Sequence, residues 1–235
     1  MGLGELQALV AARYDGMGMP SWSNPHPGMG SPRDEEYSRV TAPERYRIAY
    51  ARARAWADAL AEMPGVEVVA LAPGVLDDEG RVRRFERGLR LASPRPGTLP
   101  LLLLERETRL SDREATLAVL HISVVRPAVA VAMLPDCGCD ACDFGSEDLL
   151  HAIDQTIGGI VGGPFVAVRG PGWHAQWHPD GGSSGGTGRG RSHRDLMALC
   201  RRLAGGQDVR LPDDVEVFVG RPWLDGDAVD MGPGG

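Results

Sequence analysis

A run of five β-rich segments constrains the fold of this chain more than any other feature of its sequence. Each segment is short, and turn-forming residues such as Asp-Asp-Glu-Gly (77–80) separate it from the next. The segments cover residues 66–72, 83–92, 99–107, 115–124 and 128–134. Serial strands of this kind favour a meander, in which neighbours along the chain pair with each other. The sequence therefore predicts an antiparallel meander sheet.

Two helices are predicted beside this sheet. The first, over 42–63, follows Thr41 as its N-cap, which forms a capping box with Glu44, and Pro43 lies in its first turn, where a missing N–H costs nothing. Apolar residues then recur at helical spacing, at Tyr46, Ala49, Tyr50, Ala53, Trp56, Ala57 and Leu60. The second helix, over 146–161, has the same spacing at Leu149, Leu150, Ile153, Ile157 and Ile160. The predicted fold class is α+β, with helices packed on one face of the sheet.

Composition divides the chain into five segments. Gly, Pro and Ser are concentrated in a few stretches, which is typical of linkers inside a folded chain. In order, the predicted segments are a short helix and linker (1–36), an α+β core domain (37–175), a flexible Gly/Ser-rich segment (176–192), a C-terminal helix and strand (193–223) and a disordered tail (224–235).

The charged residues exclude several kinds of chemistry. All 25 basic residues are arginine, so a Schiff base, a pyridoxal-phosphate anchor and a P-loop lysine are impossible. The formal net charge of -7 disfavours general binding to the phosphate backbone of nucleic acids. The arginine-rich residues 81–90 alternate imperfectly with apolar ones, which is typical of a solvated strand face. We therefore expect no nucleic-acid partner, and a protein or small molecule of unknown identity instead.

The sequence also predicts no membrane partner. Its apolar runs are far shorter than the roughly 20 residues that span a bilayer. The first ten residues lack the basic region and apolar core of a signal peptide. The predicted location is the cytoplasm, where cysteines stay reduced unless they bind a metal or take part in redox chemistry.

Three of the four cysteines lie within six residues, in the stretch Asp-Cys-Gly-Cys-Asp-Ala-Cys-Asp (136–143). This stretch joins the last predicted strand to the second helix. Cys137, Cys139 and Cys142 supply three soft ligands, and zinc would need a fourth for a closed tetrahedral site. The candidates for a fourth ligand are Cys200, His121, His151 and an aspartate of the cluster.

Two other interpretations of this cluster stay open. Cys139 and Cys142 form a C-x-x-C at the predicted start of a helix, whose dipole lowers a thiol pKa, whereas nearby aspartates raise it by repulsion. That arrangement would suit a redox protein. Alternatively, the cysteines pack as small buried residues around a turn at Gly138, and the aspartates are turn and cap residues.

Two further motifs have simpler interpretations. Residues 185–192 match a phosphate-binding loop with arginine in place of lysine, but no apolar strand precedes them, so a linker is favoured. His174 and His178 have the spacing of a helical metal pair, yet flanking Gly and Pro favour a core edge or a small aromatic surface. No Ser–His–Asp or Cys–His–Asp set can be assembled, so the sequence does not identify an enzyme.

Two stretches of the sequence resemble a known family. They are Tyr-Ser-Arg-Val-Thr-Ala-Pro-Glu-Arg-Tyr (37–46) and residues 135–154, which contain the cysteine cluster. Both resemble an uncharacterised bacterial family of cytosolic proteins, classed as a domain of unknown function. In that family an YSRVT-x-PER-like helix start precedes a β region, and a CGCDACD-like corner precedes a helix. The resemblance covers residues 34–175 and implies that the corner matters, but it implies no activity, ligand or catalytic residue.

The missing catalytic set favours a non-catalytic binding or regulatory module. Its cysteine corner would be structural or stabilised by a metal, with zinc as the candidate. The alternative is a thiol-dependent redox protein or a metalloenzyme that uses the cluster, because a C-x-x-C at a helix start is typical of reactive thiols.

Overall fold

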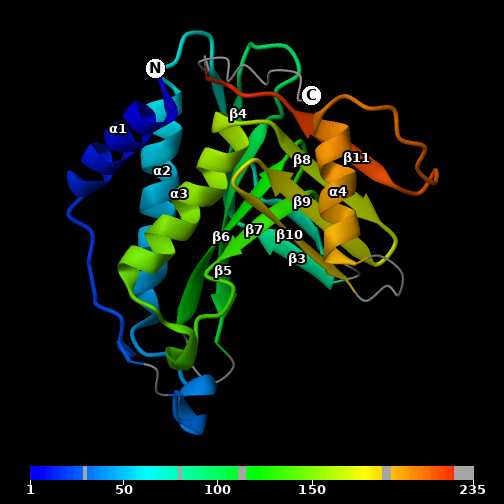
Figure 1. Ribbon diagram of the computed structural model, residues 1–235. Helices are drawn as coiled ribbons and strands as arrows, with labels where there is room; N and C mark the ends of the chain where they lie inside the picture. Colours follow the sequence, from blue (N-terminus) through cyan, green and yellow to red (C-terminus); the bar gives the residue numbers. More distant parts are fainter. Residues whose placement is uncertain (29–30, 79–80, 111–114, 187–191, 225–235) are drawn as a thin grey trace. The chain divides into compact units, whose positions relative to one another are not determined.

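The computed structural model describes residues 1–28, 31–78, 81–110, 115–186 and 192–224 (Figure 1). The chain forms two compact units. The larger unit comprises Ala8–Pro94 and Pro100–Ile157, and the smaller unit comprises Met1–Gln7, Arg95–Leu99 and Gly158–Gly235. Two helices, α1 (Leu3–Asp15) and α3 (Ser146–Gly162), contribute residues to both units, and each unit is described by itself below.

The larger unit is built on a five-stranded sheet in which every pairing is antiparallel. The strand order is β1 (Glu67–Leu71), β4 (Arg87–Ala92), β5 (Leu101–Arg109), β6 (Thr116–Val124) and β7 (Ala130–Leu134). Strands β4 to β7 pair in chain order. The predicted α+β fold with an antiparallel meander is therefore confirmed.

A hairpin that the sequence did not reveal interrupts this order between β1 and β4. Strands β2 (Gly74–Asp78) and β3 (Arg81–Phe85) pair antiparallel as a separate two-stranded sheet. The prediction of one strand over 83–92 is therefore wrong, because the segment is divided between β3 and β4. The prediction that Asp77 and Asp78 lie in a turn is also wrong, since both end β2. Residues 79 and 80 lie outside the described residues.

The hairpin exists because β5 is apolar on both of its faces. Four consecutive leucines, 101–104, are buried, and alternate side chains of a strand point to opposite faces. Leu102 and Leu104 form one core cluster with Leu76 of β2 and Phe85 of β3. The hairpin thus covers the apolar residues on one face of the sheet.

The helix α2 (Ile48–Leu60) lies on the sheet beside the first part of α3 (Figure 1). The predicted apolar stripe is confirmed, since all seven of its residues are buried. The predicted cap is wrong. A 3-10 turn, η2 (Pro43–Arg47), precedes α2, and Ala42 before it has a left-handed backbone with φ 50° and no side-chain cap. Thr41 lies one residue before the cap position, and its hydroxyl and its N–H both donate to Asp140.

An ion pair joins α2 to α3 inside the larger unit. The Arg52 guanidinium donates to Asp154 with Nε to Oδ1 at 2.8 Å, and the Trp56 indole N–H donates to the same oxygen at 2.7 Å. The side chain of Arg52 is only 9% exposed, so its charge depends on this partner.

We expect Asp154→Ala to lower the free energy of unfolding by about 3 kcal/mol, because it leaves a buried guanidinium unpaired. Asp58→Ala is the control, since it removes the exposed partner of Arg54 in an i,i+4 ion pair within α2. This change is expected to cost less than about 1 kcal/mol. Denaturant unfolding of both variants measures the difference. Equal losses would contradict a structural role for the Arg52–Asp154 pair.

The smaller unit contains a four-stranded antiparallel sheet and one helix packed on it. The strand order is β10 (Gly181–Gly186), β9 (Trp173–His178), β8 (Phe165–Gly170) and β11 (Glu216–Gly220). Leu196, Met197 and Cys200 of α4 (His193–Ala204) pack against Val166 and Val168 of β8. This confirms the predicted C-terminal helix and strand.

The expectation of a flexible segment over 176–192 is wrong for residues 176–178, which belong to β9, and for residues 181–186. Residues 181–186 form β10, which pairs with β9 along its whole length. Six Gly and Ser residues give no apolar alternation by which a strand could be recognised. Residues 187–191, and the predicted tail from 225 to 235, lie outside the described residues, while Leu224 is buried.

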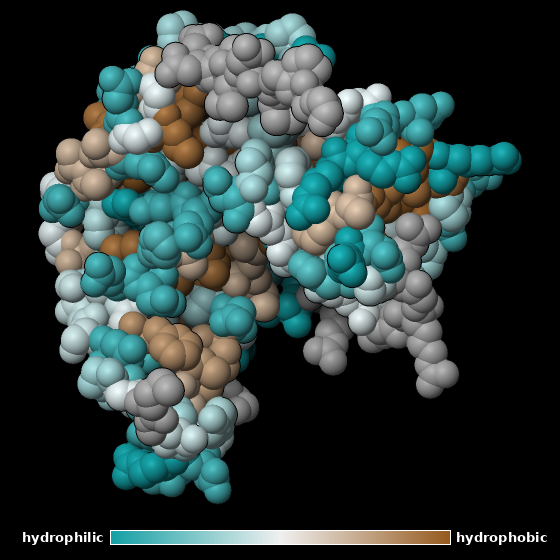
Figure 2. All heavy atoms as spheres, in the orientation of Figure 1, coloured by the Kyte–Doolittle hydropathy of each residue, from teal (hydrophilic) through white to brown (hydrophobic). Residues whose placement is uncertain are grey.

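The predicted N-terminal helix is confirmed as α1. Described residues between α1 and the short 3-10 turn η1 (Asp34–Tyr37) form no regular helix or strand. Within the described ranges, each helix is too short or too polar to cross a membrane. On the face seen in Figure 2, hydrophobic residues form small separate areas among hydrophilic ones.

Candidate metal centre

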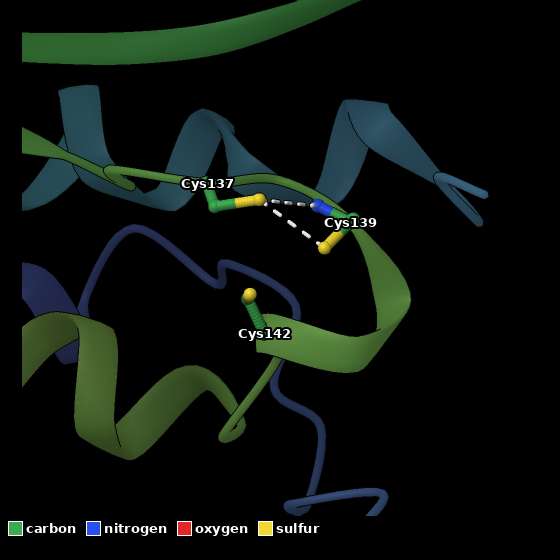
Figure 3. Close-up of side chains that lie close together, drawn as sticks. All are labelled: Cys137, Cys139 and Cys142. Atoms are coloured by element: carbon green, nitrogen blue, oxygen red, sulfur yellow. Dashed lines mark hydrogen bonds between the residues drawn. The ribbon is translucent and has the colours of Figure 1, made fainter. Parts of the chain in front are cut away.

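The three clustered cysteines converge at the corner between β7 and α3. A 3-10 turn, η3 (Asp140–Cys142), carries the chain through this corner. The three Sγ atoms lie within 4.8 Å of one another, and those of Cys137 and Cys139 are 3.2 Å apart. The three side chains point toward one another (Figure 3). Cys139 is buried, and Cys137 and Cys142 are half-buried. We call these three residues the cysteine triad.

Backbone N–H groups contact two of the three sulfur atoms of the triad, those of Cys139 and Cys137. The Cys139 sulfur accepts hydrogen bonds from the backbone of Ala141 and Cys142, and the Cys139 N–H lies 3.5 Å from the Cys137 sulfur. Burial raises the pKa of the Cys139 thiol, but hydrogen bonds from Cys137, Cys142 and these N–H groups outweigh burial and lower it overall. The turn therefore favours a thiolate at Cys139.

The other two thiols are shifted in the opposite direction. The pKa of Cys142 is raised to about 12, mainly by the hydrogen bond of its thiol to Cys139 and secondly by burial. Burial is the main cause that raises the pKa of Cys137. Three thiols that share hydrogen bonds cannot all lose their protons easily unless a cation compensates the charge, and a metal ion is such a cation.

Asp140 ties the triad to the segment before α2. Its carboxylate accepts from Arg39 Nε at 2.6 Å, from the Thr41 N–H at 2.7 Å and from the Thr41 hydroxyl at 2.8 Å. Burial raises the pKa of Asp140, but these donors outweigh it and the net shift is downward. The carboxylate is therefore ionised and fully engaged.

Asp143 makes a second set of contacts and is almost completely buried, with a side chain 3% exposed. It pairs with Arg45 and accepts from the Trp22 indole N–H at 2.9 Å and from the Gly145 N–H at 2.9 Å. The Arg45 guanidinium also lies 4.6 Å from the Trp22 ring centroid and 5.3 Å from that of Tyr46. Asp143 thus holds three separate parts of the chain at the corner.

The segment around Trp22 is fastened to the same corner. The backbone of Trp22 exchanges hydrogen bonds with Ser146, from Ser146 N to Trp22 O at 3.0 Å and from Trp22 N to Ser146 Oγ at 3.1 Å. A ring nitrogen of His26 lies 3.1 Å from the Asp140 carbonyl oxygen. These contacts anchor the segment around Trp22 at the corner.

Sequence reasoning identified the triad but missed the residues that hold it. Arg39, Thr41 and Arg45 all belong to the stretch 37–46, which stood out as the start of a helix and for its resemblance to a family. The signal was present in the charges, because that stretch carries arginines and the cysteine stretch carries aspartates. Contacts across about 100 residues cannot be assigned from charge alone.

Among the described residues, the triad is the one group with metal-ligand geometry. None of the predicted fourth ligands belongs to it. Cys200 is packed in the apolar core of the smaller unit, where burial raises its pKa to about 11. His121 is buried on β6 and His151 is exposed on α3. All three aspartates of the cluster are engaged, since Asp136 accepts from the Cys137 N–H at 2.7 Å.

Neither of the two weaker motifs forms a site within the part of the chain that the structure describes. His174 and His178 lie on β9, so four residues of extended strand, about 13 Å, separate them and a helical pair is excluded. The possible phosphate loop at 185–192 falls mostly on residues 187–191, outside the described part of the chain.

Gly145 lets the chain turn from the triad into α3. Its φ is +94°, and an added Cβ would lie 2.7 Å from the backbone nitrogen of Asn24. We expect Gly145→Ala to lower the free energy of unfolding by about 2 to 3 kcal/mol, because the positive φ disfavours a side chain and the added Cβ would clash with the backbone of Asn24. Gly28→Ala is the control, because nothing lies within 4 Å of its Cβ position. Thermal unfolding compares them, and a neutral Gly145→Ala would refute this packing.

One family model matches the chain. It is that of a family of unknown function (DUF6226), and the match covers residues 10–227. No curated protein and no solved structure matches the chain. The match includes the triad, the stretch 37–46, Trp22 and most of the smaller unit.

Proposed function

The chain belongs to this family of unknown function, and we propose that it is a metal-binding module in which Cys137, Cys139 and Cys142 hold one zinc ion. The observation that carries the proposal is the convergence of three Sγ atoms within 4.8 Å. In this proposal the metal stabilises the corner, and the protein acts by binding or regulation, without catalysis.

The spacing of the sulfur atoms fits a zinc ion. Sulfurs at about 2.3 Å from a tetrahedral zinc are about 3.8 Å apart. The Cys137 and Cys139 sulfurs are 3.2 Å apart and no two of the three are more than 4.8 Å apart, a range that contains that value. Side-chain rotations would bring the three sulfurs onto one ion.

The surroundings of the triad also support metal binding. Backbone hydrogen bonds to the Cys139 sulfur orient it and stabilise the thiolate, as outer-shell donors do in metal sites. Asp140 and Asp143 fix the two ends of the turn from outside. The ligands are thus positioned by rigid contacts and do not depend on a mobile loop.

A structural or regulatory role is favoured over catalysis by the state of the carboxylates. Asp140 and Asp143 are each held in an ion pair with an arginine, so neither is readily available to move a proton as a general base. The role of the site is then to hold together the parts of the chain that meet at the corner.

A thiol redox function is the second candidate. It rests on the 3.2 Å separation of the Cys137 and Cys139 sulfurs and on the lowered pKa of Cys139. It predicts that reduced protein passes two electrons to an added disulfide such as oxidised glutathione, with formation of one intramolecular disulfide and two molecules of reduced glutathione.

Elemental analysis of tag-free protein, purified without chelator, tests the proposal. We expect close to one zinc ion per chain, lost in a Cys137→Ser/Cys139→Ser/Cys142→Ser variant and kept in Cys200→Ala, the control for the remaining cysteine. Metal-free protein that also fails to bind added zinc would overturn the metal proposal. If that protein forms a disulfide with oxidised glutathione, the redox candidate takes its place.

A further inference from the structure

The triad supplies three ligands, and no fourth donor of the described residues completes it. Asp140 and Asp143 could reach the metal only by giving up Arg39 and Arg45, which would leave a half-buried guanidinium without its partner in the case of Asp143. Asp136, whose Oδ1 accepts from the Cys137 N–H at 2.7 Å, is not part of the group of ligand atoms that lie within 4.8 Å of one another. Asp140 and Asp143 therefore cannot close the site without losing contacts that hold the corner.

The triad is accessible from the side of Cys137 and Cys142. Cys139 is buried, whereas Cys137 and Cys142 are half-buried, so solvent reaches the group past these two residues. A ligand from outside the chain can approach along the same side. This differs from a closed structural site, in which four protein ligands exclude any other donor.

Resting on the proposed metal site, we propose that its fourth ligand is an exchangeable thiolate from outside the chain. An ion bound by three thiolates is in a soft, sulfur-rich environment, which favours a further sulfur donor over water. The incoming thiol binds through its sulfur and releases its proton to solvent. The site would thus recognise a small thiol or an exposed cysteine of another protein.

A second copy of this chain is a poor source of that thiolate. The chain has four cysteines, and the one outside the triad, Cys200, is completely buried in the core of the smaller unit. A second copy could offer only its own triad, at the loss of its own metal ligands. The donor is therefore a different molecule.

Cobalt substitution tests this inference on the full chain. Tetrahedral Co²⁺ bound by thiolates absorbs through sulfur-to-metal charge transfer, and the intensity rises with the number of thiolates. We expect 2-mercaptoethanol to raise this absorbance saturably by about one third, as three thiolates become four. Reduced glutathione is the second probe, and a matching rise would extend the inference to cysteines within peptides.

Two controls separate this inference from the proposed function. The Cys137→Ser/Cys139→Ser/Cys142→Ser protein, given the same cobalt and thiol, measures the signal of cobalt–thiol complexes in solution. A wild-type protein that binds no cobalt contradicts the metal site itself. If the wild type binds cobalt but neither thiol changes its spectrum more than that solution signal, the metal site stands and the exchangeable thiolate is overturned.

Discussion

Asp143→Ala is expected to lower the free energy of unfolding by about 4 to 5 kcal/mol, more than Asp154→Ala or Gly145→Ala. The substitution leaves the Arg45 guanidinium, the Trp22 indole N–H and the Gly145 N–H without their acceptor at a site where the carboxylate is 3% exposed. Each orphaned buried donor costs about 1 to 3 kcal/mol, and a charged one costs more. Urea unfolding in the presence of a chelator measures the loss without any contribution from metal.

Asp148→Ala is the matched control for this prediction. Asp148 is exposed in the first turn of α3, so its loss removes only a favourable interaction with the helix dipole, about 0.3 to 1 kcal/mol. A double-mutant cycle of Asp143→Ala with Arg45→Ala isolates the ion pair. If Asp143→Ala costs no more than Asp148→Ala, the corner is not held as described.

Removal of the metal is expected to have the second large effect. A ligand that binds only the folded state stabilises it by about 4 kcal/mol when its free concentration is 1,000 times the Kd. A chelator should therefore lower the Tm of the zinc-loaded protein by about 8 to 16 °C, given about 2 to 4 °C per kcal/mol for a chain of this size. Differential scanning calorimetry with and without chelator gives the shift.

The triad variants decide whether this shift belongs to the proposed site. In the Cys137→Ser/Cys139→Ser/Cys142→Ser protein the chelator should leave the Tm unchanged, whereas Cys200→Ala should respond like the wild type. A chelator effect of equal size in the triple variant would place the metal elsewhere in the chain.

The helices and the meander could be predicted because their signals are local. The stripe from Tyr46 to Leu60 shows one face of α2, and the spacing in 146–161 shows one face of α3. The hairpin β2–β3 was missed because Asp77 and Asp78 end a strand with the residues of a turn. Strand β10 was missed because Gly and Ser carry no apolar pattern.

The candidate site could be predicted only in part, for the same physical reason. The three cysteines are close in sequence, so any tight turn brings their sulfurs together. The groups that fix the turn come from far away, with Arg45 98 residues and Trp22 121 residues from Asp143. The prediction of a Thr41 cap did not include a distant partner either, because the Thr41 hydroxyl donates to Asp140, 99 residues later.

The two motifs that suggested a family resemblance turn out to be two halves of one structure. Arg39, Thr41 and Arg45 from the first motif bind Asp140 and Asp143 from the second. A metal at the triad would add a third tie at the point where these halves meet. Metal binding and the seating of the Trp22 segment are then expected to stabilise each other.

X-ray absorption spectroscopy at the zinc edge tests the central claim most directly, because it counts the sulfur neighbours of the bound ion. For zinc-loaded protein in thiol-free buffer, the account predicts three sulfur neighbours at about 2.3 Å and one lighter atom. The sulfur neighbours should disappear in the Cys137→Ser/Cys139→Ser/Cys142→Ser variant. A shell of nitrogen and oxygen alone, or a sulfur shell that persists in that variant, would contradict a metal site at the cysteine triad.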